Sequence, residues 1–336
     1  MSFTVPPADG SIFVSLNHLV RLEHRAQGLS FLPHQSRRSV LAGKHSSRMR
    51  GRGLDFEEIR AYVPGDDLRT VDWKVTLRTG RPQVRAYTEE RDRPMLVIVD
   101  QSMSMYFGSI RAMKSVIAAE LAALIAWSVV GASDRIGAIV FDDTNITRMR
   151  PQRSRNHVHA ILGAIAKANA TLQAETDISI NPHQLDKSLE TALALNTHDH
   201  MICVISDFAG ANERTRQLLR ELTAKNDVIA AMVFDPTALD VKSGGHIVVT
   251  GGDLQIEIDM GEHSRMRSSL HEHFQERQEA IHDMLKRSGV PLMMFDTARD
   301  SADQLRQMLG RPLAAPDHNR HQQQRAQLAS SGGNHG

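Results

Sequence analysis

Short apolar runs alternate with longer segments of helical periodicity between about residues 94 and 296. The runs, rich in Val and Ile, are MLVIVD, RIGAIVFDD, MICVIS, VIAAMVF and VPLMMFD, and the helical segments cover residues 110–131, 157–170, 185–195, 212–225 and 265–288. Continuous apolar runs are typical of strands that are buried on both faces of a parallel sheet. The pattern therefore predicts an α/β fold with a doubly wound, mostly parallel sheet.

The flanking regions have a different pattern, which predicts three parts. Residues 1–93 form an N-terminal extension with a basic arm and a charged segment, and residues 94–310 form the α/β domain. Residues 311–336 are polar and rich in Gln and Gly, so we expect a disordered tail. Within the α/β domain, GGHIVVTGGDLQIEIDMG predicts an added hairpin.

Composition narrows the class of protein. The chain has 336 residues, of which 41% are hydrophobic, and a single cysteine, Cys203, inside an apolar run. One cysteine excludes a disulfide framework, and we expect it in the core. The longest apolar stretch begins at Val116 and is interrupted by Glu120. It falls short of the roughly 20 apolar residues that span a bilayer, so we expect a buried helix, no transmembrane segment and a cytoplasmic protein.

The net charge is only +1, but the basic residues are unevenly distributed. Between Arg21 and Arg52 there are eight Lys or Arg residues and one acid, Glu23. This basic arm could bind phosphate or an acidic partner, or it could be a solvated connection. It lacks the interleaved aromatic residues of a single-strand binding platform, so binding to nucleic acid is not expected.

Oxygen-bearing side chains follow two of the predicted strands. Asp100 ends the run MLVIVD and is followed on alternate residues by Ser102 and Ser104, and Asp207 follows MICVIS. Because ligands of open α/β sheets bind at the carboxyl ends of strands, these oxygens predict a site for Mg²⁺, or for Mn²⁺ or Ca²⁺. Thr176, on a loop before a helix, could add a hydroxyl. Each residue taken singly could instead be a helix N-cap.

The order DQSMS, ETD and SDF resembles the metal-ion-dependent adhesion site (MIDAS) of von Willebrand factor A-type domains. In that site the first loop gives Asp and two Ser, the second Thr and the third Asp. The family usually has Gly-Gly before the threonine, whereas here Glu175 precedes Thr176. Without glycine the loop is less free to adopt a positive φ, which leaves Asp177 or Ser179 as substitute ligands.

The segment RGRGLDFEEIRAYVPGDDLRTVDWKVTLRTGRPQVRAYTEERDRP, together with the MLVIVDQSMSM that follows it, resembles the signature of domain of unknown function family 58. Members are von Willebrand A-like proteins typically encoded beside MoxR-type AAA+ ATPases. The resemblance covers about residues 15–310 and implies a MIDAS-type metal site. It also implies an adaptor or chaperone-like role with such an ATPase.

The PGDD part of this signature segment predicts a rigid, charged turn. Its notable residues are Arg60, Tyr62, Pro64, Gly65, Asp66, Asp67, Arg69, Asp72 and Trp73. We expect the arginines, Arg78 included, to pair with nearby acids, and Tyr62 and Trp73 to anchor the turn to the sheet through apolar area. An acid–base role for the adjacent carboxylates is the alternative.

No enzyme motif accompanies the predicted metal site. The chain lacks a Walker-type glycine loop, a Gly-x-Ser-x-Gly elbow and an HExxH pair. We therefore predict a binding module whose cation captures an Asp or Glu of a client protein. One alternative is a Mg²⁺-dependent phosphatase-like hydrolase, although that chemistry needs a second Asp where this chain has Ser102. Another is attachment to nucleic acid or a membrane surface through the basic arm.

Overall fold

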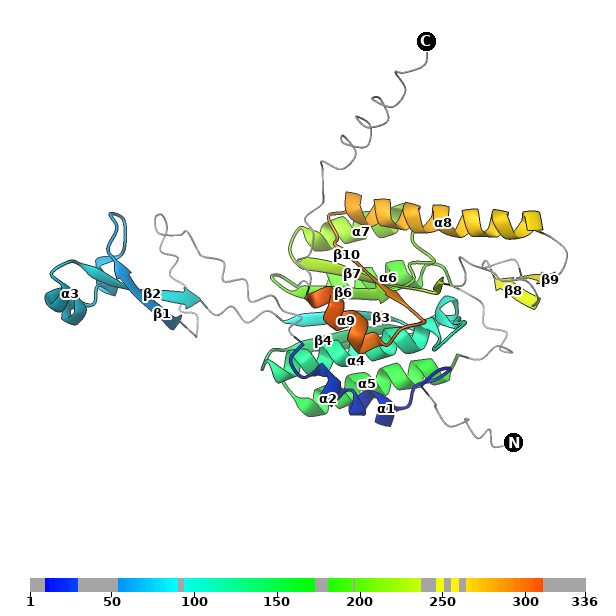
Figure 1. The fold of residues 1–336 in the computed structure, drawn as a ribbon, viewed down its shortest axis with the longest axis horizontal. Helices are drawn as coiled ribbons and strands as arrows, with labels where there is room; N and C mark the ends of the chain where they lie inside the picture. The colour runs from blue at the N-terminus through cyan, green and yellow to red at the C-terminus, as the bar shows by residue number, and fades with distance from the viewer. Residues whose placement is uncertain are drawn as a thin grey trace, which may run out of the picture. The chain divides into compact units, whose positions relative to one another are not determined.

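In a computed structural model of the chain, the described residues are 10–29, 54–89, 94–172, 181–195, 197–236, 246–250, 255–259 and 264–310. The chain forms two compact units, residues 32–92 and residues 1–31 with 93–336 (Figure 1). The expected N-terminal extension is therefore not one unit, because its first part belongs with the α/β unit. The predicted tail lies outside the described residues.

Six strands form the central sheet of the α/β unit. They are β3 (Met95–Asp100), β4 (Ile136–Phe141), β5 (Ile146–Gln152), β6 (Met201–Ser206), β7 (Asp227–Phe234) and β10 (Leu292–Asp296). Their order is β10-β7-β6-β3-β4-β5, and only the β4–β5 pair is antiparallel. Every residue of β3, β4 and β6 is buried, as expected for strands covered on both faces. The predicted doubly wound, mostly parallel sheet is confirmed.

Helices cover both faces of this sheet (Figure 1). They are α4 (Lys114–Gly131), α5 (Arg155–Ala170), α6 (Gln184–Ala194), α7 (Glu213–Thr223), α8 (Ser264–Arg287) and α9 (Ser301–Leu309). The side chains of α6, α7 and α8 pack into one core with Leu96 and Ile98 of β3, while α4 packs against β3, α5 and α9. Of the described helices, α4 is the one long and apolar enough to cross a membrane by length and composition, yet it is largely buried. The predicted buried helix is confirmed.

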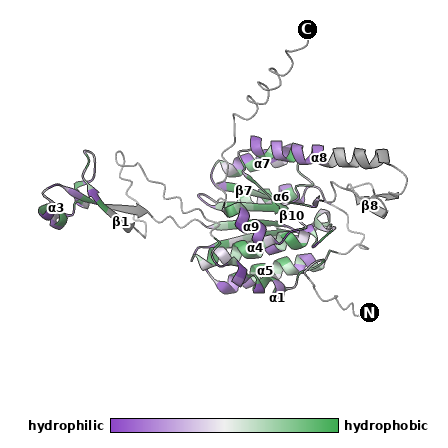
Figure 2. Ribbon diagram, viewed as in Figure 1, coloured by the Kyte–Doolittle hydropathy of each residue, from purple (hydrophilic) through white to green (hydrophobic). Residues whose placement is uncertain are grey.

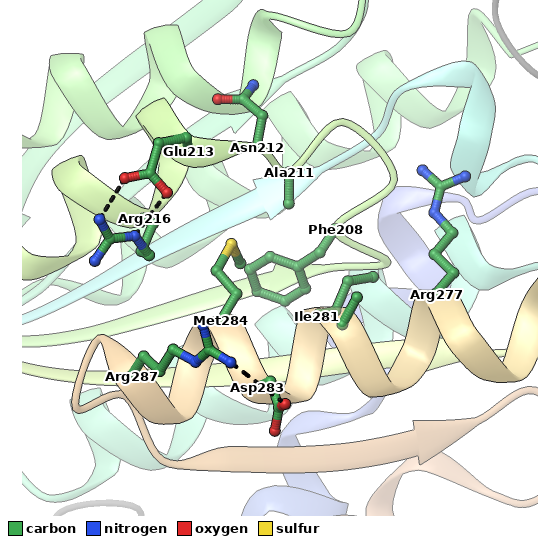
Figure 3. Close-up of a pocket in the computed structure, with 11 residues that line it drawn as sticks. Phe208, Ala211, Asn212, Glu213, Arg216, Arg277, Ile281, Asp283, Met284 and Arg287 are labelled. Carbon is green, nitrogen blue, oxygen red and sulfur yellow. Dashed lines mark hydrogen bonds and ion pairs between the residues drawn. The ribbon is translucent and has the colours of Figure 1, made fainter.

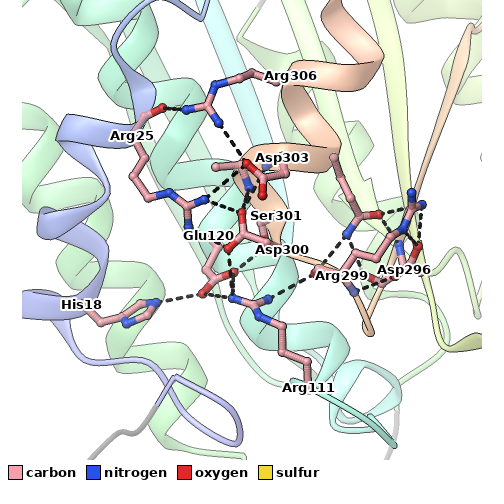
Figure 4. Close-up of polar contacts among 12 residues, drawn as sticks. His18, Arg25, Arg111, Glu120, Asp296, Arg299, Asp300, Ser301, Asp303 and Arg306 are labelled. Atoms are coloured by element: carbon pink, nitrogen blue, oxygen red, sulfur yellow. Dashed lines mark hydrogen bonds and ion pairs between the residues drawn. The ribbon is translucent and has the colours of Figure 1, made fainter.

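The N-terminal helix α1 (Leu16–Arg21), which α2 (Glu23–Ala26) follows, is tied to α4 through one buried carboxylate, Glu120 (Figure 4). His18 Nε2 lies 2.8 Å from Glu120 Oε1, Arg111 Nη2 lies 3.2 Å from both carboxylate oxygens, and Ser301 Oγ of α9 donates to Oε2. Burial raises the pKa of Glu120, but hydrogen bonds from His18 and Ser301 and the charge of Arg111 hold it below its ordinary value. One ionised group therefore holds three segments together.

The small unit consists of an antiparallel pair and a short helix. These are β1 (Leu54–Ala61), β2 (Gln83–Glu89) and α3 (Trp73–Thr79). Asp72 caps α3 by accepting from the amides of Lys74 and Val75, and Gly80 ends it at φ +69°. The chemistry of the caps thus sets the length of this helix.

The predicted charged turn is present, and Trp73 beside it is exposed within the small unit. Arg60 forms an ion pair with Asp66 at 2.7 Å, as expected, whereas Arg69 and Arg78 form none with any described residue. Trp73 does not pack within the small unit, where its side chain is 65% exposed, and its expected contact with the sheet of the α/β unit stays a prediction. The exposure follows from the orientation of α3, in which Thr76 faces β2 and accepts from the Gln83 amide at 3.0 Å, leaving Trp73 outside. Tyr62 is half-buried.

Two smaller predictions are confirmed. The predicted hairpin is an antiparallel pair of β8 (His246–Thr250) and β9 (Gln255–Asp259). Cys203 is free and buried, and burial raises the pKa of its thiol to about 12. The thiol is therefore protonated at neutral pH and serves as a core residue.

Candidate metal centre

Four of the five predicted ligands meet at the carboxyl edge of the sheet. Asp100 is the last residue of β3, and Asp207 follows the adjacent parallel strand β6. Ser102 and Ser104 lie in the turn after β3. Thr176 lies outside the described residues, as do its substitutes Asp177 and Ser179.

The four side chains form a continuous chain of oxygen contacts. Ser102 Oγ donates to Asp100 Oδ1 at 2.6 Å and lies 3.2 Å from Ser104 Oγ, which donates to Asp207 Oδ1 at 3.2 Å. Neighbouring ligands of an octahedral Mg²⁺ at 2.0–2.1 Å are about 2.9 Å apart, so this spacing and donor set fit the ion. No cluster of three His, Cys, Asp or Glu side chains suited to a metal occurs in the described part of the chain. A cation here would depend on mixed carboxylate and hydroxyl ligands.

Gln101, between Asp100 and Ser102, turns its side chain into the core and holds the loop in place. Gln101 is fully buried, donates to the Ser115 carbonyl at 3.0 Å and accepts from Asn169 Nδ2 at 2.9 Å. Asn169 Oδ1 in turn accepts from the Val14 amide at 2.9 Å. Asp100 and Ser102 thus turn their oxygens towards the candidate site, while the Gln101 amide between them makes hydrogen bonds in the core. Asn169 was not singled out from the sequence, although a polar residue on an otherwise apolar helix face was a usable signal.

The turn after β6 places Asp207 at the edge and its neighbour in the core. Ser206 Oγ donates to Asp100 Oδ2 at 2.6 Å and accepts from the Phe208 amide at 2.9 Å. Phe208 has φ +55° and a fully buried ring. A left-handed conformation in a bulky residue costs on the order of 1–3 kcal/mol. This strain is typical of functional sites, and here it aims Asp207 at the ligand cluster.

The two carboxylates differ in their electrostatic environment. Lys114, the first residue of α4, places Nζ 2.6 Å from Asp207 Oδ2. Burial raises the pKa of Asp207, but the charge and hydrogen bond of Lys114 hold it below its ordinary value. Burial and the charge of Asp207 raise the pKa of Asp100 to about 7, and no described basic side chain contacts it. The charge of Asp207 is therefore neutralised by Lys114, whereas Asp100 has no positive counter-charge among the described residues.

Asp143 is a further buried acid at this edge that the sequence analysis missed. It follows β4 and accepts from the amides of Met103 at 2.7 Å and Asn181 at 3.0 Å. It thereby ties the ligand turn to the first described residue after Thr176. The signal was available, because the run RIGAIVFDD ends in acids just as MLVIVD does.

A groove of about 760 Å³ lies beside the centre, between α7 and α8 (Figure 3). Phe208, Ile281 and Met284 line it with apolar surface. Arg277 donates to the carbonyl of Ala209, two residues beyond Asp207. The groove therefore shares the β6 turn with the centre, but its lining includes none of the four ligands.

Comparison with known proteins places the chain in a family. The model described as "Protein of unknown function DUF58" matches residues 58–280. The chain is 28% identical over 264 residues to the uncharacterized proteins Mb1516 of Mycobacterium bovis and Rv1480 of Mycobacterium tuberculosis, covering 78% of this chain and 80% of each relative.

Solved structures that resemble it include BatB from Bacteroides thetaiotaomicron, at 14% identity and a TM-score of 0.32 over 58% of this chain and 98% of that one. A von Willebrand factor type A protein from Catenulispora acidiphila has 12% identity and a TM-score of 0.33 over 66% and 43%. The match of the family model over most of the chain shows that the protein belongs to the DUF58 family.

Proposed function

We propose that the protein is a metal-dependent interaction module that captures a partner carboxylate. A Mg²⁺ ion, or Mn²⁺ or Ca²⁺, would be held by Asp100, Ser102, Ser104 and Asp207, with Thr176 as a fifth ligand. The observation that carries the proposal is the state of Asp100, a buried carboxylate bonded to two serine hydroxyls with no basic partner among the described residues. A buried charge of this kind needs a counter-ion.

The charges at the centre favour one anionic ligand from outside. Asp100 and Asp207 contribute two negative charges and Lys114 one positive charge, so the group carries one net negative charge when both acids are ionised. A bound divalent cation would change this to one net positive charge. The ion would act as an electrophile, because three of its five proposed protein ligands are neutral hydroxyls. A single Asp or Glu from a partner would restore neutrality.

The wider role is proposed from the family resemblance. It is that of a cytoplasmic adaptor or chaperone-like partner of a MoxR-type AAA+ ATPase, acting on client proteins. The metal centre would supply the switchable contact with either protein.

The arrangement offers little to a hydrolase. A phosphatase of the type considered above needs a second acid two residues after Asp100, where Ser102 instead donates to Asp100. Two other described acids at this edge are engaged, since Asp207 pairs with Lys114 and Asp143 accepts hydrogen bonds from two backbone amides. These contacts support a binding role over catalysis.

Attachment through the basic arm is supported less well. Arg25 forms two hydrogen bonds with Asp300, at 2.6 and 2.7 Å, so it is engaged within the α/β unit. The basic residues from Arg37 to Arg52 lie outside the described residues. We therefore give the interaction function to the metal centre.

The test is affinity purification of the full-length protein in Mg²⁺ and in EDTA. The wild type is compared with Asp100→Asn and Asp207→Asn, which remove one charge each with little change in shape. Asp142→Asn is the matched control, because Asp142 also follows β4 but only caps its own turn, which asparagine can do as well. Bound proteins are identified by mass spectrometry.

We expect an AAA+ ATPase or client to be recovered in Mg²⁺ with the wild type and with Asp142→Asn. Recovery should be lost in EDTA and in the other two variants. Recovery that is indifferent to EDTA would contradict the proposal. So would hydrolysis of phosphate esters by the wild type that disappears in Asp100→Asn.

A further inference from the structure

The small unit turns large apolar side chains outward. Trp73 is 65% exposed and Leu77 is 85% exposed, and their spacing of four residues puts them on one face of α3. Three more exposed apolar side chains belong to the same unit: Ile59, Val63 and Leu68. Thus five of the nine large apolar side chains that are exposed in the described part of the chain lie in this short unit.

The interior of the unit is correspondingly small. Within residues 59–85, the buried apolar side chains are Val71 and Val84. The ribbon of α3 carries both hydrophobic and hydrophilic residues (Figure 2). Exposed apolar patches on soluble proteins mark interaction sites, and a unit this short has little core to stabilise it alone. A covering surface is therefore expected.

The charges of the unit indicate what covers it. Lys74 and Arg78 form a second stripe on α3, each next in sequence to one of the exposed apolar residues. Neither forms an ion pair with a described residue, and the same holds for Arg69 and Arg81. Among the side chains that the structure describes in this unit, those of residues 59–85, these four cations stand against one acid without an ion pair, Asp67, which caps the short turn after it. The described surface of the unit is therefore apolar and basic.

We propose that the face formed by Trp73, Lys74, Leu77 and Arg78, the Trp73 face, docks a segment of a partner protein that carries Asp or Glu beside apolar side chains. Tryptophan and arginine in such positions are the residues that dominate binding energy at interfaces. A second copy of this chain would bring like charges together. Single-stranded nucleic acid would need a row of aromatic residues to stack on, whereas four of the five exposed side chains are aliphatic.

The experiment uses a photo-crosslinking amino acid in place of Leu77 in the full-length protein, produced in its own cells. The control carries the crosslinker at Gln217, an exposed position on α7 of the other unit. Crosslinked peptides are sequenced by mass spectrometry. The Leu77 version is then combined with Lys74→Glu and Arg78→Glu, or with the charge-conserving pair Lys74→Arg and Arg78→Lys. Circular dichroism confirms that each variant is folded.

We expect position 77 to capture a peptide of another protein with Asp or Glu beside apolar residues, well above position 217. Charge reversal should lower the yield by about tenfold, equivalent to about 1.4 kcal/mol. The charge-conserving pair should stay within about twofold of the parent. A yield no higher than at position 217, or one unchanged by charge reversal, would overturn the proposal. An adduct with nucleic acid, with a basic peptide or with this chain itself would also overturn it.

Docking at the Trp73 face should not need the metal centre, since none of the five proposed ligands lies in the small unit. The crosslinking is therefore repeated in EDTA. A yield at position 77 that persists in EDTA supports the Trp73 face as a separate docking surface. Loss in EDTA would show that capture depends on the metal centre and would overturn this inference.

Discussion

The candidate metal centre at the carboxyl edge of the sheet and the small unit depart from the usual distribution of side chains in opposite ways. At the edge, Asp100 and Ser102 are polar but buried, and each has hydrogen-bond partners. In the small unit, Trp73 and Leu77 are apolar but exposed. Buried polar groups are stable only when they are satisfied, and exposed apolar groups are stable in solution but favour association. The first region is therefore suited to an ion and the second to a protein surface.

Of the two tryptophans of the chain, Trp127 should give the largest loss of stability on replacement, and Trp73 the smallest. Trp127 of α4 is 4% exposed and donates from Nε1 to the Leu19 carbonyl at 3.3 Å. Trp127→Ala should lower the free energy of unfolding by about 3–5 kcal/mol, because it leaves a cavity and an unpaired carbonyl. Denaturant titration measures the change. A loss under about 1 kcal/mol would mean that α4 is not packed as described.

Glu120 should have the next largest effect. Glu120→Ala removes the shared acid of His18, Arg111 and Ser301 and should cost about 3 kcal/mol, because these partly buried groups lose the acceptor that they share. Limited proteolysis should also cut the first 29 residues faster. Glu190→Ala is the control, since its partner Arg214 is exposed and its melting temperature should be unchanged. Equal losses of stability and equal rates of proteolysis in the two variants would contradict the role of Glu120 in holding these segments together.

A smaller effect should depend on pH. The pKa of Asp100 is raised from 3.8 to about 7 in the folded state, so the folded protein binds this proton more tightly than the unfolded chain does. The resulting stability is present at low pH and is lost as the pH rises from 3.8 towards about 7.

In EDTA, the unfolding free energy of the wild type should therefore fall relative to that of Asp100→Asn as the pH rises from 3.8 towards about 7. Mg²⁺ should oppose the shift by replacing the proton. Parallel pH profiles of the two proteins would show that Asp100 has an ordinary pKa.

The smallest effect is predicted for Trp73. Because its side chain is largely exposed, Trp73→Ala should change the unfolding free energy by less than about 1 kcal/mol. In the wild type, iodide should readily quench the fluorescence of Trp73 but not that of Trp127. A loss of about 3 kcal/mol would show that the side chain is buried in solution.

Periodicity allowed the fold and part of the site to be predicted. Continuous apolar runs identified the parallel strands, and their ends located Asp100 and Asp207. The edge strand β5 was not predicted, because ITRMRPQ mixes polar and apolar residues and pairs antiparallel on one side only. A one-sided strand lacks the pattern of a buried one.

The remaining site residues depend on contacts between distant parts of the chain. Ser206 meets Asp100 across 106 positions, and Lys114 meets Asp207 across 93. No local spacing encodes these pairs. The exposure of Trp73 within the small unit was not predicted for a related reason, since an aromatic residue in a signature segment does not reveal which face of α3 packs against β2.

Direct titration of Mg²⁺ into metal-free, full-length protein tests the central claim most directly. Isothermal calorimetry above pH 7 should show one binding site in the wild type and in the control Asp142→Asn, and none in Asp100→Asn or Ser102→Ala. At a free Mg²⁺ concentration 100 times the dissociation constant, the wild type should gain about 2.7 kcal/mol of unfolding free energy. Absence of binding by the wild type, or equal binding by Asp100→Asn, would contradict the account.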